Sequence, residues 1–233
     1  MATTRNLARM AGVLYLAVGV LGGFAEYVRT SAVTPGDAQA TAAGIVQHST
    51  LFHLGLAADL IDLPCFIAVG LILYRILKPV EPTVALAMLV LNAVSVAMQG
   101  VNMLNQAGAL IVATHPEYAT GMTSLFFLEL HREGYVIAQI FFGGYMLPLA
   151  YLVYRSAMFP KALGIVLAVG GAGYLAGVVA TVASANLNSG VAAYFGLIGG
   201  LGEIVFLLWL LVFGAGAATT DRTQATGALT WKA

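Results

Sequence analysis

Long apolar stretches separated by short polar turns dominate the chain. A helix needs about 20 mostly apolar residues to cross a bilayer core about 30 Å thick. Six stretches reach that length, at residues 10–28, 51–77, 84–107, 134–154, 163–183 and 191–213. Proline and glycine stand in several of the gaps, where they interrupt helices. The pattern therefore predicts an all-α fold, a polytopic transmembrane six-helix bundle over residues 1–216. Residues 217–233 have no apolar period and are predicted to form a flexible tail.

Local signals refine the ends of these stretches. Pro82 stands just ahead of the third stretch, in a first-turn position where proline removes no helix hydrogen bond. Asp37 can cap a short helix of small residues between the first two spans. That helix could lie on the membrane surface or run straight into the second span. Residues 124–133 could likewise extend the fourth span outward or rest among the lipid headgroups.

The composition agrees with a membrane protein. Hydrophobic residues make up 60% of the chain and charged residues only 9%, whereas a soluble domain is about 25% charged. So few charged groups could not cover the surface of a globular domain. The formal net charge is zero, so there is no basic field to attract nucleic acid. Cys65 is the one cysteine of the sequence, which excludes an intramolecular disulfide and a cysteine zinc cluster.

Basic residues set the expected orientation in the membrane. Most of them fall at one end of the six-span arrangement: Arg5, Arg9, Arg75, Lys78, Arg155, Lys161, Arg222 and Lys232. Arg29 and Arg132 fall at the other end. Because cytoplasmic loops carry an excess of Lys and Arg, both termini are predicted to be cytoplasmic.

The chain has 27 glycines, which indicate close packing of helices. Small residues four positions apart let helix backbones approach closely in lipid. Three pairs within the spans have this spacing: Gly19 and Gly23, Gly173 and Gly177, and Gly196 and Gly200.

Carboxylates inside the spans are the main functional signal, because a charge at the bilayer centre costs about 2.5–3.5 kcal/mol or more. Asp59 and Asp62 share a face of the second span, and Glu203 lies near the middle of the sixth. No Lys or Arg is expected at a similar depth. Arg132 is the one outer-half cation expected within reach, and Glu129, three residues earlier, is its simplest partner.

Polar stripes on two further spans complete the pattern. The third span carries Asn92, Ser95, Gln99, Asn102 and Gln106 at spacings of three and four residues, and the fourth carries His131, Tyr135 and Gln139. Such stripes can converge on one outward-opening polar cavity, or they can simply join helices by hydrogen bonds. The candidate ligand-binding residues are Asp59, Asp62, Gln99, Asn102, His131, Tyr135, Gln139 and Glu203.

Three classes of function fit this pattern. The leading hypothesis is the binding of a small or lipid-like ligand in the cavity, from which transport or sensing could follow. The second is an intramembrane enzyme, metal-dependent or not, in which His131 acts with Asp59 or Glu203. The third is a structural or accessory subunit. No HExxH motif and no histidine pair one turn apart occurs, so no metal site or cofactor is predicted. Membrane lipids are the expected partners, and the protein could also form a homo-oligomer.

Short segments along most of the chain resemble a known family. They are RMAGVLYL (9–16), PGDA (35–38), LFHLG (51–55), ADL (58–60), KPV (78–80), LH (130–131), GY (134–135), IFFG (140–143), LG (163–164), GYL (173–175), GE (202–203) and LWLL (208–211). Through them the chain resembles the bacterial membrane-protein family called domain of unknown function 4386, over about residues 5–214. The resemblance implies a multi-pass protein of the bacterial inner membrane without an assigned activity. It also implies that Asp59, His131, Tyr135 and Glu203 occupy motif positions.

Overall fold

The computed structural model describes residues 3–118, 123–183 and 191–216. Within them the chain forms seven α-helices, one short 3-10 helix and no strand. The helices are α1 (Thr4–Ala32), α2 (Ala38–Gln47), α3 (Ser49–Leu77), α4 (Pro82–Thr114), η1 (Pro116–Tyr118), α5 (Ser124–Arg155), α6 (Lys161–Ala183) and α7 (Val191–Val212). The predicted all-α fold is confirmed. The predicted tail, residues 217–233, lies outside the described residues.

Six of these helices are long and apolar enough to cross a membrane, namely α1 and α3 to α7. This confirms the six predicted spans, although α1, α4 and α5 reach further than expected. α4 continues to Thr114, and α5 begins at Ser124, where the side chain of Thr123 caps the helix by accepting from the backbone nitrogen of Phe126. Residues 124–133 are therefore a helical extension of the fourth span.

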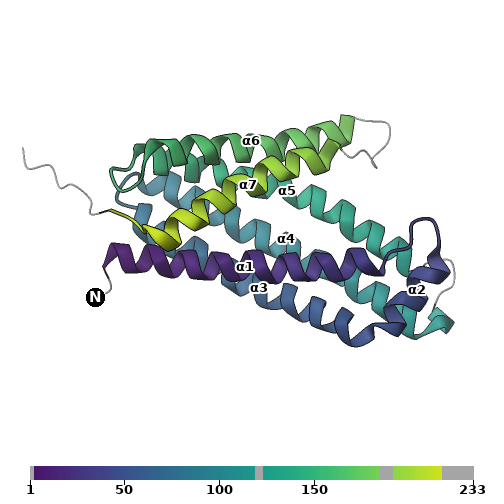
Figure 1. The fold of residues 1–233 in the computed structure, drawn as a ribbon. Coiled ribbons are helices and arrows are strands. Elements are labelled where there is room, and N and C mark those ends of the chain that lie inside the picture. Colours follow the sequence, from purple (N-terminus) through teal and green to yellow (C-terminus); the bar gives the residue numbers. More distant parts are fainter. Residues whose placement is uncertain (1–2, 119–122, 184–190, 217–233) are drawn as a thin grey trace, which may run out of the picture.

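The short helix expected after Asp37 is present as α2. The Asp37 carboxylate accepts from the backbone nitrogen of Ala40 at 2.8 Å, which satisfies one of the free amide groups at the helix start. α2 ends at Gln47, before α3 begins at Ser49, so it is separate from the second span. It packs against α4 and α5, at the end of the bundle away from the N-terminus (Figure 1).

The spans form a closed ring around a shared interior. Each packs on the next along the chain, and α7 returns to pack on α1. The main apolar core includes Leu73, Met146, Leu149, Leu167 and Phe206. A second, smaller cluster, which includes Ile45 of α2, seats this helix on the neighbouring spans.

Glycines create the closest helix contacts where α5, α6 and α7 meet. A Cβ atom on Gly143 would lie 2.7 Å from a carbonyl oxygen of α6, and one on Gly173 would lie 3.1 Å from Ile198 of α7. The predicted close packing is thus confirmed at Gly173. It was wrong for Gly19 and Gly23 of α1, where a Cβ atom would meet no described atom within 4 Å.

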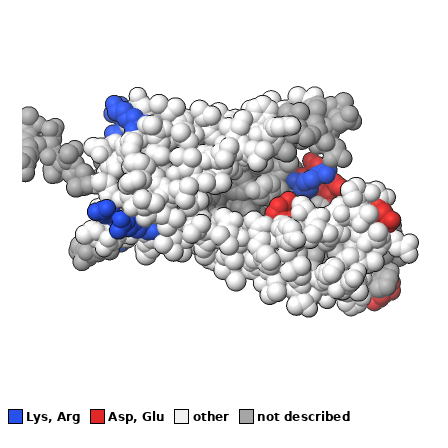
Figure 2. Space-filling model, in the orientation of Figure 1, with Lys and Arg blue, Asp and Glu red and all other residues white. Residues whose placement is uncertain are grey.

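Charge is divided between the two ends of the bundle. In Figure 2, Lys and Arg gather at the end that holds the N-terminus, whereas Asp and Glu gather at the opposite end around a single cluster of basic atoms. The membrane-crossing middle of this face carries almost no charge, as a lipid-facing surface requires.

Candidate functional site

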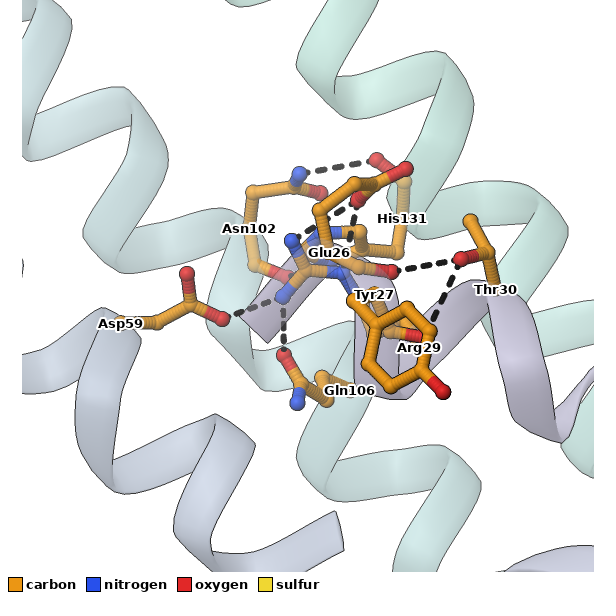
Figure 3. A network of polar contacts seen from close by, with 8 residues as sticks. All are labelled: Glu26, Tyr27, Arg29, Thr30, Asp59, Asn102, Gln106 and His131. Atoms are coloured by element: carbon orange, nitrogen blue, oxygen red, sulfur yellow. Dashed lines mark hydrogen bonds and ion pairs between the residues drawn. The ribbon is translucent and has the colours of Figure 1, made fainter. Parts of the chain in front are cut away.

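Arg29 of α1 lies inside the bundle, with only 7% of its surface exposed. Its Nη1 donates to Asp59 of α3 and, at 2.9 Å, to Oε1 of Gln106 of α4. Its Nη2 and Nε both donate to Oε2 of Glu26, one helical turn earlier, at 3.0 and 3.2 Å. One guanidinium therefore ties three helices together (Figure 3).

This network corrects the expectation that no cation lies at the depth of Asp59. α1 continues to Ala32 instead of ending near residue 28, so Arg29 belongs to the buried part of the helix. The sequence does contain one signal that Arg29 points inward. Glu26 and Arg29 are three residues apart, and both lie on the same face of α1 as Tyr15.

Arg132, the cation expected near the carboxylates, pairs locally. Its Nη2 lies 2.6 Å from a carboxylate oxygen of Glu129 and 3.1 Å from one of Glu133. The pairing with Glu129 is the predicted one. Arg132 and Glu129 are both well exposed, so this ion pair lies at the surface and leaves the interior carboxylates untouched.

Asn102 and His131 join α4 to α5 beside the Arg29 network. Nδ2 of Asn102 donates to the backbone carbonyl of His131 at 2.9 Å, and Nδ1 of His131 lies 3.2 Å from the backbone carbonyl of Asn102. The second contact is a hydrogen bond when Nδ1 carries the proton. Gly134 makes room for Asn102, since a Cβ atom there would collide with the Asn102 side chain. Both residues are engaged in holding the two helices together.

A second network surrounds Glu203 of α7. The hydroxyls of Tyr15 (α1) and Tyr145 (α5) each donate to Oε1 at 2.5 Å, and the hydroxyl of Tyr174 (α6) donates to Oε2 at 2.8 Å. The Tyr15 and Tyr145 hydroxyls are also 2.6 Å apart. Glu203 thus joins four helices.

Sequence reasoning missed these three tyrosines. They lie on three different helices, and no periodicity within one helix relates them to Glu203. Tyrosine hydroxyls in apolar spans were the available signal, because a buried hydroxyl generally has a hydrogen-bond partner.

α1 and α7 touch at one end of the bundle and separate towards the other. A Cβ atom on Gly12 would lie 2.7 Å from a backbone nitrogen of α7, and Tyr15 bonds to Glu203 one turn further on. Beyond Tyr15, Gly19 and Gly22 follow on the same face of α1, and a Cβ atom on either would meet no described atom within 4 Å. Figure 2 shows the surface hollowed between the two helices, and we term this space the α1–α7 cleft.

Tyr135 of α5 is the most exposed of the predicted site residues. Its ring lies 5.7 Å from that of Phe142, which lies 6.0 Å from that of Tyr174, and the Tyr174 hydroxyl bonds to Glu203. The Tyr135 side chain is 41% exposed. Tyr135 is therefore the exposed end of a row of rings that leads inward to Glu203.

Asp62 and Gln139 lie deeper, each with 6% of its surface exposed. Oδ1 of Asp62 and Oε1 of Gln139 have no hydrogen-bond partner among the described residues. Asp62 lies three residues after Asp59 and thus on the same face of α3. The Gln139 amide nitrogen is 3.5 Å from the position of a Cβ atom on Gly196 of α7, so its side chain points towards α7.

The predicted site residues fall into three groups. Asp59 belongs to the Arg29 network, which His131 and Asn102 adjoin, and Glu203 forms the tyrosine network. Asp62, Tyr135 and Gln139 take part in the hydrogen bonds of neither network. Gln99 is half-buried on α4 and takes part in none of the hydrogen bonds of the described residues. In the part of the chain that the structure describes, no three His, Cys, Asp or Glu side chains are arranged to hold a metal ion.

Six spans with polar networks buried between them define a multi-pass membrane protein. Residues 10–214 match the family model described as domain of unknown function (DUF4386). The chain belongs to this family, as its resemblance predicted. It is also similar to an uncharacterized protein of Archaeoglobus fulgidus, with 24% identity over 148 residues, which cover 64% of this chain and 76% of that protein. No solved structure matches the chain.

Proposed function

We propose that this protein binds a small or lipid-like ligand in the α1–α7 cleft. The observation that carries the proposal is the hollow between α1 and α7, together with the exposure of Tyr135, whose row of rings leads to Glu203. Polar groups that only join helices are expected to form hydrogen bonds directly with one another, because an unpaired polar group inside a membrane is costly. An open polar space suits a protein that admits a ligand there.

The position of the cleft supports a ligand that enters from the side or from the outer end. Gly19 and Gly22 leave the α1 side of the cleft without side chains, and Gly196 and Gly200 on α7 have only ordinary or distant contacts with neighbouring side chains. The Tyr15–Glu203 bond closes the bottom. An amphiphile could therefore place its polar part on Asp62 and Gln139 while its apolar part remains between the helices.

The proposal includes the sidedness of the cleft. The basic end of the bundle is assigned to the cytoplasm, on the positive-inside bias, with both termini there. The wide end of the cleft then opens away from the cytoplasm. The proposed location is a bacterial inner membrane, which the charge asymmetry and the family resemblance support. Transport or sensing would follow from binding.

Filling the cleft tests the proposal. Gly22→Leu adds a side chain to an empty position of α1, whereas Val20→Leu enlarges an exposed side chain on another face of the helix and serves as the control. Purified protein would be screened by thermal unfolding against a panel of lipids and small molecules. A ligand present at 100 times its Kd stabilises by about 2.7 kcal/mol.

We expect at least one compound to raise the Tm of the wild type and of Val20→Leu, and to have no effect on Gly22→Leu. An equal rise in Gly22→Leu would place binding outside the cleft and contradict the proposal.

A further inference from the structure

We propose, on the basis of the ligand-binding function above, that the α1–α7 cleft takes an organic cation with an ammonium group. The observations that point to it are the buried and unpartnered Oδ1 of Asp62 on α3, and a row of aromatic rings on α5 and α6 that ends at the carboxylate of Glu203 on α7. The ammonium group would lie against Asp62, and its apolar substituents against Tyr135, the exposed end of the row.

The charge balance around the cleft favours a positive ligand. The described part of the interior holds the carboxylates of Asp59, Asp62 and Glu203 and the buried cation Arg29, which also pairs with the exposed Glu26. Arg29 is already bonded to Glu26 and Asp59. Within residues 3–118, 123–183 and 191–216, Asp62 and Glu203 form no ion pair. A site with excess negative charge attracts cations and repels anions.

The side-chain oxygens of Asp62 and Gln139 that lack hydrogen-bond partners are acceptors, which an ammonium group requires. Oδ1 of Asp62 is buried and has no hydrogen-bond partner among the described residues. An ionised carboxylate only accepts hydrogen bonds, and an ammonium group only donates them. Gln139, whose side-chain oxygen also lacks a partner, offers a further acceptor on α5. A buried polar atom without a partner is costly, so a donor placed between Asp62 and Gln139 would stabilise the bundle.

Aromatic rings extend the site in a way that suits an organic cation and not a bare metal ion. The rings of Tyr135, Phe142 and Tyr174 form a row, with centroids 5.7 Å and 6.0 Å apart. The Tyr174 hydroxyl bonds to Glu203, so this row ends at the carboxylate. Ring faces attract alkylammonium groups through their negative quadrupole and their apolar surface. Rings and carboxylates together therefore recognise both parts of such a ligand.

Three probes of equal chain length separate charge from hydrophobicity: hexylammonium, hexanol and hexanoate. Binding to the purified full-length protein would be measured by calorimetry near neutral pH. We expect hexylammonium to bind at least tenfold more tightly than hexanol, and hexanoate to show no binding. Asp62→Asn and Glu203→Gln should each weaken hexylammonium binding at least tenfold, and leave hexanol binding unchanged. Glu117→Gln removes an exposed carboxylate of η1 and should change nothing.

The outcomes separate this inference from the proposed function. Equal binding of hexanol and hexylammonium, with both lost in Gly22→Leu, would overturn the cation while the cleft remained a ligand site. Undiminished hexylammonium binding in Gly22→Leu would place the amine elsewhere and overturn this inference, as would full displacement of hexylammonium by millimolar sodium. If Asp62→Asn does not fold, Glu203→Gln alone decides, because Glu203 is a separate carboxylate on α7.

Discussion

The hydroxyl of Tyr15 on α1 donates to Oε1 of Glu203 on α7 at 2.5 Å, although the two residues lie 188 positions apart in the chain. This bond joins the first span to the last one and marks the bottom of the α1–α7 cleft. The same oxygen accepts from Tyr145 of α5, so the contact between α1 and α7 is fixed against a third helix.

Replacement of Glu203 by glutamine should break at least one of the hydrogen bonds that the tyrosines donate to it. Glu203→Gln keeps the size of the side chain, but it replaces one of the two carboxylate oxygens by an amide nitrogen, which cannot accept a hydrogen bond. A hydroxyl left without an acceptor costs about 1–3 kcal/mol. We expect a folded protein with a lower free energy of unfolding, as measured by denaturant titration in detergent.

Tyr174→Phe provides the control for that prediction, because it removes the hydroxyl that bonds to Oε2. If this hydroxyl loses its acceptor in Glu203→Gln, the double variant should lose less stability than the sum of the two single variants. Strictly additive losses would mean that the two groups do not interact.

Loss of Arg29 should destabilise the protein far more than loss of Arg132. Arg29→Gln leaves the buried carboxylate of Asp59 without its cation, which costs about 3–5 kcal/mol. Arg132→Gln breaks only exposed ion pairs, each worth about 0–1 kcal/mol. Thermal unfolding of both variants measures the difference. Adding Asp59→Asn to Arg29→Gln should recover part of the loss, whereas similar Tm values for the two single variants would argue against a buried ion pair.

Two glycine substitutions should have opposite effects on stability. In Gly143→Ala, the new methyl group would lie 2.7 Å from the backbone carbonyl oxygen of Gly171, and such overpacking costs about 1–3 kcal/mol. In Gly22→Ala, it would meet no described atom within 4 Å, and the higher helix propensity of alanine stabilises by up to about 1 kcal/mol. The unfolding free energy of Gly143→Ala tests the close packing of α5 on α6. That of Gly22→Ala tests whether the cleft is empty. Equal destabilisation would contradict the second point.

The membrane orientation is tested by reporter fusions. Fusions after Lys78, Arg155 and Ala233 should report a cytoplasmic location, and those near Asp37, Pro116 and Asn188 an external one, because the basic loops are expected to stay inside. An external C-terminus would invalidate both the orientation and the outward opening of the cleft.

The sequence by itself determined the spans. About 20 apolar residues suffice to identify a membrane-crossing helix, and the six predicted stretches all lie in helices long enough to span. Local signals were equally reliable where the interaction is local. Asp37 caps α2, Pro82 stands in the first turn of α4, and Glu129 pairs with Arg132 three residues later. The polar stripe on α4 is also largely buried, as its period indicated.

Only the tertiary structure decided which helices these faces meet. A period of 3.6 residues defines one side of a helix but carries no information about its neighbour. The sequence therefore could not reveal that Arg29 turns inward to Asp59, because a charge near the end of a span is stable either in water or against a buried partner across the bundle. For the same reason it could not assign three tyrosines to Glu203. Nor could it distinguish Gly173, packed against α7, from Gly19, which faces the cleft, since both belong to the same small-residue pattern and differ only in what lies opposite.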